Sequence, residues 1–211
     1  MAEAFQSARL VYRAIEDNEE DIGLLNSLNQ ESEGRTNNSH AIFKPVNKKF
    51  SQQQAKNFEE SFLCVLICLP ISVQNDHSGS SPQYLESIGR VGLWKIEENF
   101  RHHRSANIGI HILAAYQRKG YGSEAINWTL NWAFQMAGMH RVGIASVSYN
   151  PGALRLYERL GFAPEGRIRE SIWYDGAWYD YVMLGMLENE WRLRQKKQTR
   201  VVGNIPTSTE W

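Results

Sequence analysis

Short stretches in which apolar and polar residues alternate, or in which apolar residues follow one another directly, predict seven β-strands. The first alternates around Leu10, Tyr12 and Ala14, and the densest is the apolar run that begins at Leu63. The last two flank Asp-Gly at 175–176, a strong hairpin signal. The predicted strands are residues 8–14, 63–73, 84–96, the isoleucine-rich run 108–112, and residues 140–148, 162–172 and 178–187.

Helical spacing of apolar residues predicts four helices between these strands. The clearest follows residue 123, where Ile126, Leu130, Ala133, Phe134 and Ala137 stand at i, i+4, i+7, i+8 and i+11. The other three begin at capping signals. These signals are Asp17 with Glu20, Ser51 with Gln54, and Asn150 followed by Pro151.

This order of elements predicts an α/β fold, a mixed sheet with helices on its faces. The helix at 123–137 joins two strands and should form a right-handed parallel crossover. We expect one domain over residues 8–190 and a charged, flexible extension over residues 191–211. The polar stretch 30–49 is long for a connector, so we expect it either to move or to face a substrate.

Lysine and arginine balance aspartate and glutamate, 23 to 23, in this chain of 211 residues. Because the chain has no net charge and so no overall electrostatic field, we do not expect nucleic acid or membranes as general partners. No apolar run reaches the roughly 18 residues of a membrane span, and the first residues lack the apolar core of a signal peptide. We therefore expect a cytoplasmic protein, either a monomer or a homodimer.

The two cysteines, Cys64 and Cys68, stand four residues apart in one predicted strand, too far apart to form a disulfide. No second cluster of metal ligands follows them, and His77, His102 and His103 lack ligand spacing. We expect two buried thiols, a reducing compartment and no bound metal.

The segment from Gln117 to Gly122, which reads QRKGYG, follows a predicted strand and precedes a helix that opens at Ser123. Backbone N–H groups at a helix start have no intrahelical partner, and the helix dipole adds partial positive charge there. Glycines let the backbone approach a phosphate closely. The segment predicts an anion site, although it matches neither the G-x-x-x-x-G-K-[ST] phosphate loop nor the G-x-G-x-x-G dinucleotide motif.

A second motif follows about 30 residues later, where Asn150, Ala153, Tyr157, Gly161 and Phe162 give the pattern N-x-x-A-x-x-x-Y-x-x-x-G-F. Together with the strand and Q-x-x-G-x-G of the first motif, it resembles the GNAT superfamily of acetyl-CoA-dependent N-acetyltransferases. The Ile-Gly step at 108–109 and the strand around 180–184 further resemble its ribosomal-protein (RimJ/RimL-like) branch. The resemblance is specific over residues 84–190 and only topological over residues 8–62.

The resemblance implies a GNAT fold that binds acetyl-CoA and moves its acetyl group directly to a primary amine in a ternary complex. Backbone groups around residues 111–113 would pair with the pantetheine and supply the oxyanion donor, and their strand should splay from its parallel neighbour at 141–148 to open a slot. The cofactor-binding residues implied are Ile110, His111, Ile112, Leu113, Gln117, Arg118, Lys119, Gly120, Tyr121, Gly122, Ser123, Asn150, Ala153 and Tyr157.

The resemblance also implies catalytic roles. Tyr157 stands where the family has its general acid. A phenol suits this role because it is protonated at neutral pH and can donate a proton to a departing thiolate. The alternative is that Tyr157 is simply an aromatic residue of the core. Asn150 would orient the cofactor or a water, a role compatible with that of an ordinary N-cap. Asn107 stands where the branch often has an acidic residue, which puts a carboxylate base in doubt. His111 is a candidate base by its ordinary pKa, and a chain of waters is another route for the proton.

The acceptor stays open between a protein N-terminus and a small amine such as a polyamine, an amino acid or an antibiotic. A polyamine site needs carboxylates, which residues 16–21 and 31–33 could supply, although both stretches also read as solvated helix charge; Glu97 and Glu98 are expected to be uninvolved. Aromatic residues at 173–181 either wall the acceptor pocket or pack across strands. The alternatives from other classes are a GNAT-fold protein that binds acyl-CoA as a regulator without turnover and a nucleotide-binding module.

Overall fold

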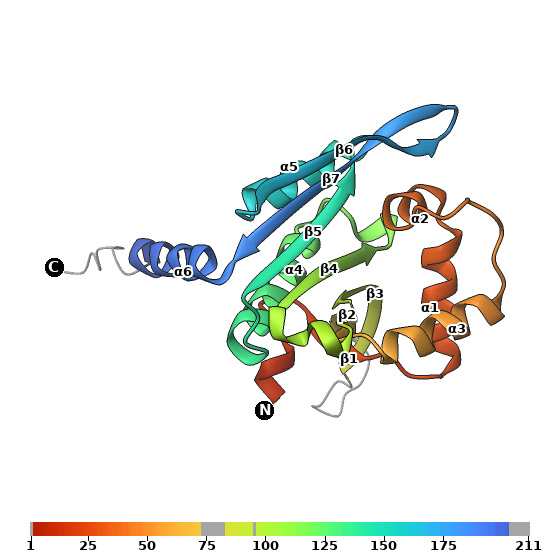
Figure 1. The fold of residues 1–211 in the computed structure, drawn as a ribbon. Helices are drawn as coiled ribbons and strands as arrows, with labels where there is room; N and C mark the ends of the chain where they lie inside the picture. The colour runs from red at the N-terminus through yellow and green to blue at the C-terminus, as the bar shows by residue number, and fades with distance from the viewer. Residues whose placement is uncertain (1, 73–82, 95, 203–211) are drawn as a thin grey trace, which may run out of the picture.

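The computed structural model of the chain describes residues 2–72, 83–94 and 96–202. Seven strands of these residues form one mixed sheet in the order β1-β2-β3-β4-β5-β7-β6 (Figure 1). The strands are β1 (Val11–Ala14), β2 (Leu63–Ser72), β3 (Gln83–Leu93), β4 (Ser105–Ile112), β5 (Arg141–Val147), β6 (Ala163–Tyr174) and β7 (Ala177–Leu187). The α-helices are α1 (Glu19–Gln30), α2 (Ser32–Asn38), α3 (Lys48–Glu59), α4 (Tyr121–Asn131), α5 (Pro151–Arg159) and α6 (Glu188–Val202). The predicted α/β mixed sheet is confirmed.

The sheet opens in its middle, between the parallel strands β4 and β5. They are paired only from Ser105 opposite Arg141 to Asn107 opposite Gly143. From Ile108 onward β4 keeps its antiparallel partner β3 but leaves β5, while β5 continues beside β7. The predicted splay is therefore confirmed, and it begins directly after Asn107.

Two apolar clusters hold the layers together, one on each face of the sheet. The alternation of β2 separates them, because Val65 and Ile67 join one cluster while Leu66 and Cys68 join the other. The second cluster is closed by α1 and α3, through side chains such as Leu25 and Phe58. The first, larger cluster includes the inward residues of α4 together with Tyr157 and Leu160 near the end of α5. Figure 1 shows α1, α2 and α3 gathered together at the right of the sheet.

Several element boundaries differ from the predicted ones for local reasons. The first helix is capped by Asn18, whose side chain accepts the Asp21 N–H, and the third by Asn47. The expected polar connector 30–49 contains helix α2. The expected capping boxes at Asp17 and Ser51 therefore do not form the helix starts. The predicted helix at 123–137 begins at Tyr121 and ends in a π-helical turn over Trp132–Met136.

Residues 188–202 form helix α6, which takes in the first part of the expected extension 191–211. Trp191 anchors α6, because its side chain is only 3 % exposed and its ring lies 5.4 Å from that of Phe134. Arg194 lies against Gly161, whose φ of +90° ends α5. Residues 203–211 of the expected extension lie outside the described residues.

Candidate active site

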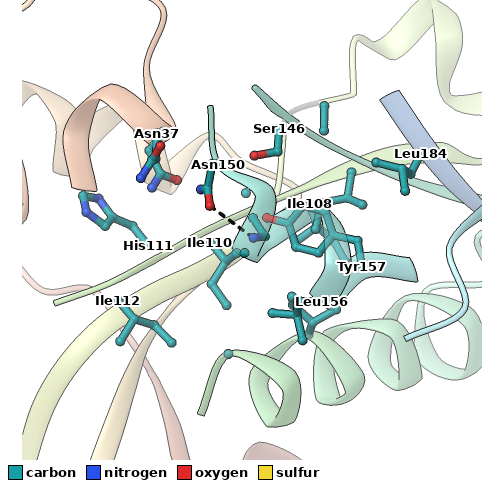
Figure 2. Close-up of a pocket in the computed structure, with 18 of the residues that line it drawn as sticks. Asn37, Ile108, Ile110, His111, Ile112, Ser146, Asn150, Leu156, Tyr157 and Leu184 are labelled. Carbon is teal, nitrogen blue, oxygen red and sulfur yellow. Dashed lines mark hydrogen bonds between the residues drawn. The ribbon is translucent and has the colours of Figure 1, made fainter. Parts of the chain in front are cut away.

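A cavity of about 1370 Å³ occupies the opening between β4 and β5. It is lined by α2, by the splayed part of β4, by the loop that precedes α4, by α5, and by residues of β5, β6 and β7. Seven segments, several of them distant in the sequence, therefore meet where β4 separates from β5. Figure 2 shows part of the lining.

The loop before α4 takes the backbone shape that an anion site requires. Arg118 has φ +59° and Gly120 has φ +87°, and α4 begins at the next residue. The side chain of Gln117 fixes the loop, because its Nε2 donates to the carbonyl oxygen of Ile112 over 2.9 Å. The first N–H groups of α4, which have no partner within the helix, include those of Gly122 and Ser123, and both residues line the cavity.

The N-terminal segment braces this loop, a contact that sequence analysis missed. The Glu124 carboxylate, in the first turn of α4, accepts hydrogen bonds from Arg9 Nε at 2.8 Å, from the Arg9 N–H at 2.7 Å and from Ser7 Oγ at 2.7 Å. Arg9 also donates to the Lys119 carbonyl oxygen at 3.0 Å and lies over the Tyr121 ring at 4.7 Å. No local sequence pattern predicts these contacts, because they join residues more than 100 positions apart.

Helix α5 places Asn150 and Tyr157 on the cavity wall. Asn150 caps the helix, since its Oδ1 accepts the Ala153 N–H at 3.1 Å. Tyr157 lies two turns further on, is 7 % exposed and packs edge-on against Phe162. Burial raises the pKa of Tyr157 to about 12, so its phenol is protonated throughout the neutral range.

The two faces of β4 meet different parts of the cavity. Ile108 and Ile112 point into the larger cluster with α4, whereas His111 points toward α2. Figure 2 shows His111 and Asn37 together, apart from Leu156 and Tyr157. The face of His111, which the sequence left undecided, is therefore the face covered by α2.

The edge of β4 that faces the opening carries the backbone groups of its even-numbered residues. The Leu113 N–H already donates to the Ile88 carbonyl oxygen at 2.9 Å, on the β3 side. Because backbone groups alternate between the two edges of a strand, those of Ile110 point away from β3. Of the implied pantetheine partners, Ile110 and Ile112 face the opening, and the N–H of Leu113 does not.

His111 is buried beside a second buried basic side chain, that of Arg90. It lies opposite Arg90 in the β3–β4 pairing, and the two side chains are 5 % and 6 % exposed. Its Nε2 atom has no hydrogen-bond partner among the described residues. A Cβ atom added to Gly34 of α2 would lie 2.5 Å from that Nε2, so Gly34 covers it. Burial, with the positive charge of Arg90 adding to it, lowers the pKa of His111 to about 3.

Helix α2 is joined to the far side of the opening through Tyr149. The Tyr149 hydroxyl donates to the carbonyl oxygen of Thr36 at 2.8 Å. The Tyr149 ring stacks on Tyr174 at 4.8 Å and meets Tyr179 edge-on at 4.9 Å. His40 meets Tyr181 edge-on at 4.9 Å. The polar stretch 30–49 and the aromatic hairpin thus form one wall of the cavity.

The structure brings together most of the residues that the sequence nominated. Leu113, Lys119 and Tyr121 are not among the described residues of the lining, and neither are Glu97 and Glu98, which lie at the start of an exposed 3₁₀ helix. The described residues hold no group of three or more histidine, cysteine, aspartate or glutamate side chains placed for a metal. The predicted site residues that line the cavity are Ile110, His111, Ile112, Gln117, Arg118, Gly120, Gly122, Ser123, Asn150, Ala153 and Tyr157.

Sequence comparison relates the chain to known acetyltransferases. Residues 9–163 match the model of the family described as "Acetyltransferase (GNAT) domain". A spermidine N(1)-acetyltransferase of Vibrio cholerae is 30% identical over 106 residues, which are 50% of this chain and 61% of that protein. YdaF of Bacillus subtilis, which its name assigns provisionally to the ribosomal N-acetyltransferases, is 30% identical over 103 residues, 49% of this chain and 55% of that protein. The matched region thus spans less than two thirds of these relatives.

Solved structures share the fold. The crystal structure of spermidine N-acetyltransferase from Vibrio cholerae in complex with CoA and spermine has a TM-score of 0.69 at 22% identity and covers 88% of this chain and 99% of its own. A GNAT-family acetyltransferase from Bacillus anthracis has a TM-score of 0.67 at 20% identity, covering 88% and 98%. At these identities the likeness concerns the fold. Within the described residues, no helix is both long and apolar enough to cross a membrane.

Proposed function

The chain belongs to the GNAT acetyltransferase family, and from this premise we propose that it transfers the acetyl group of acetyl-CoA to a primary amine directly, in a ternary complex. The observation that carries the proposal is the cavity at the β4–β5 opening, which has the anion-binding loop and Tyr157 on its wall. Cofactor and acceptor can meet there without a covalent enzyme intermediate. Both cysteines lie in β2, outside the described lining.

The residues present suit acetyl-CoA. The N–H groups at the start of α4 would hold the pyrophosphate, with Arg118 beside them. The backbone of Ile110, on the free edge of β4, would pair with the pantetheine as with an added strand. Lys119 and Tyr121, also implied by the resemblance, act by shaping the loop, because Lys119 lies over the Tyr116 ring and Tyr121 under Arg9.

The chemistry follows from the groups along β4 and α5. The neutral amine attacks the thioester carbonyl carbon, and a backbone N–H on the free edge of β4 stabilises the oxyanion that forms. The C–S bond then breaks, and the Tyr157 phenol gives its proton to the departing sulfur. The nitrogen loses its extra proton to water, and Tyr157 is reprotonated from solvent. Asn150 holds the start of α5, and with it Tyr157, in place.

His111 serves this reaction as a neutral group. A base whose conjugate acid has a pKa of about 3 does not retain a proton at neutral pH. Taking a proton from an α-ammonium group, with a pKa of roughly 8, would cost about 7 kcal/mol. We therefore assign the removal of that proton to water in the cavity, and we assign to His111 the role of a neutral side chain packed under α2.

A polyamine is a second candidate acceptor, favoured by the name of the Vibrio cholerae relative. A protein N-terminus is favoured by the resemblance to the ribosomal-protein branch and by the name of YdaF. We place the protein in the cytoplasm as part of the same proposal, and its state as monomer or homodimer stays a prediction.

The experiment is an acceptor screen with the full chain. Release of CoA thiol and acetylation of the amine, detected by mass, are measured with acetyl-CoA and a panel of peptides, amino acids and polyamines. Acetyl-CoA should also raise the melting temperature. Tight binding of acetyl-CoA without acetylation of any amine would support the non-catalytic regulator instead. Protection by ATP but not by acetyl-CoA would support the nucleotide-binding module.

A further inference from the structure

The charged residues of the cavity wall are all of one sign. Among the lining residues that the structure describes, four are arginines and none is aspartate or glutamate. Arg118 belongs to the anion loop, and Arg155 and Arg159 belong to α5. The fourth, Arg141, is paired with Glu165, with its Nε 2.9 Å from that carboxylate. The positive charge of this lining suits the phosphates of acetyl-CoA.

The lining residues that the structure describes on the acceptor side of the cavity, under α2, are polar but uncharged. Its lining consists of amide, hydroxyl, phenol and imidazole groups from α2, the residues after it, and the aromatic hairpin. Partial burial lowers the pKa of His40, so that its imidazole is neutral at pH 7. The residues are Thr36, Asn37, Asn38, His40, Tyr149, Tyr174 and Tyr181.

Two described carboxylates of the candidate polyamine stretches already have partners within the chain. Glu31 stands beside this wall, with its Oε2 3.2 Å from the position of a Cβ atom added to Gly34, and it accepts the Ala114 N–H with both oxygens at 3.1 Å. Asp21 is fully buried and accepts both Nη atoms of Arg13, at 2.8 and 2.6 Å. The sequence had offered 16–21 and 31–33 as a polyamine site; the side chain of Glu33 lies outside the described residues.

We propose that the acceptor is a primary amine at the end of an uncharged chain of hydrogen-bonding groups, as a peptide N-terminus presents it, and that polyamines are poor substrates. The proposal rests on the acetyl transfer proposed above. Asn37, Asn38 and the phenols can pair with peptide N–H and C=O groups. A polyamine would bring two or three further positive charges to a wall whose described residues offer no carboxylate, and burying an uncompensated charge is costly.

The test compares two kinds of acceptor on the full chain. One is a set of C-terminally amidated peptides that differ in the first residue and carry no other charge; the other is spermidine. For the best peptide, kcat/KM should exceed that for spermidine by roughly 10- to 100-fold, the value of one or two charge-assisted hydrogen bonds that the polyamine cannot make. The same peptides with acetylated N-termini should release no CoA.

A negative charge introduced on the acceptor wall gives a second, independent test of the inference. Asn37→Asp should raise kcat/KM for spermidine relative to the peptide by about tenfold, whereas the matched Asn37→Ala should not. If spermidine matches or exceeds the best peptide with the wild-type chain, the inference is overturned and the acetyl transfer stands. If neither kind of acceptor is acetylated while acetyl-CoA still binds, the proposed function itself fails.

Discussion

The Tyr149 hydroxyl and the Thr36 carbonyl oxygen, 113 positions apart in sequence, are joined by a 2.8 Å hydrogen bond across the opening of the sheet. This bond holds α2 against the loop that follows β5. It makes this wall of the cavity, which we propose as the acceptor side, from two parts of the chain, while the loop before α4 and helix α5 lie along the rest of the cavity.

Removing this bond should loosen the acceptor wall without disturbing the cofactor site. We expect Tyr149→Phe to raise KM for the acceptor several-fold and to leave KM for acetyl-CoA unchanged. The free energy of unfolding should fall by only about 1 kcal/mol, the net value of one hydrogen bond. Initial rates with each substrate varied in turn, together with a urea melt, measure the three quantities. An equal rise in both KM values would show that Tyr149 does not act on the acceptor side alone.

Gly34 should tolerate no side chain. A Cβ atom there would lie 2.5 Å from His111 Nε2, so Gly34→Ala must push α2 away from β4. We expect a loss of about 1–3 kcal/mol in the free energy of unfolding and weaker binding of the acceptor. Gly23→Ala is the matched control, because Gly23 is also helical and nothing lies within 4 Å of its added Cβ. The control should gain roughly 0.5–1 kcal/mol from helix propensity.

His111 should make the fold sensitive to mild acid. Its pKa is about 3 in the folded chain and about 6.5 when unfolded, so the unfolded state binds the extra proton first as the pH falls. The stabilising contribution is therefore fully present above pH 6.5 and is lost progressively toward pH 3. Between pH 7 and pH 4.5 the loss should be about 3 kcal/mol.

The variant His111→Gln removes this titration and serves as the comparison. The difference in unfolding free energy between pH 7 and pH 4.5, taken from urea melts, should be smaller in the variant by that amount. Identical pH dependence in the two proteins would mean that His111 is not held neutral in the folded state.

Parts of this site could be predicted from the sequence because their chemistry is local. The glycines at 120 and 122 predicted a loop before a helix start by backbone rules, the Asn150–Tyr157 spacing predicted the phenol through the family resemblance, and the structure puts both segments on one cavity. The splay after Asn107 was expected only through the resemblance.

Other parts could not be predicted, because they depend on contacts between distant segments. Helix α2, which reads SEGRTNN, has no apolar stripe, and it packs through Gly34, Arg35 and Thr36 instead. The bond between Arg9 and Glu124 spans 115 positions. The face of β4 that carries His111 depends on which helix covers it. The helix after residue 187 is highly charged, and among its side chains that the structure describes only that of Trp191 is buried.

The most direct test of acetyl transfer at the β4–β5 opening is the turnover of Tyr157→Phe, with Tyr84→Phe, an exposed site on β3, as the control. CoA release is measured with saturating acceptor, and binding of acetyl-CoA is measured separately. We predict that kcat falls about 100-fold or more in Tyr157→Phe while the affinity for acetyl-CoA and the kcat of the control stay at wild-type values. A kcat within about threefold of wild type, in a folded variant that binds acetyl-CoA normally, would contradict the account, because the departing thiolate would then obtain its proton elsewhere.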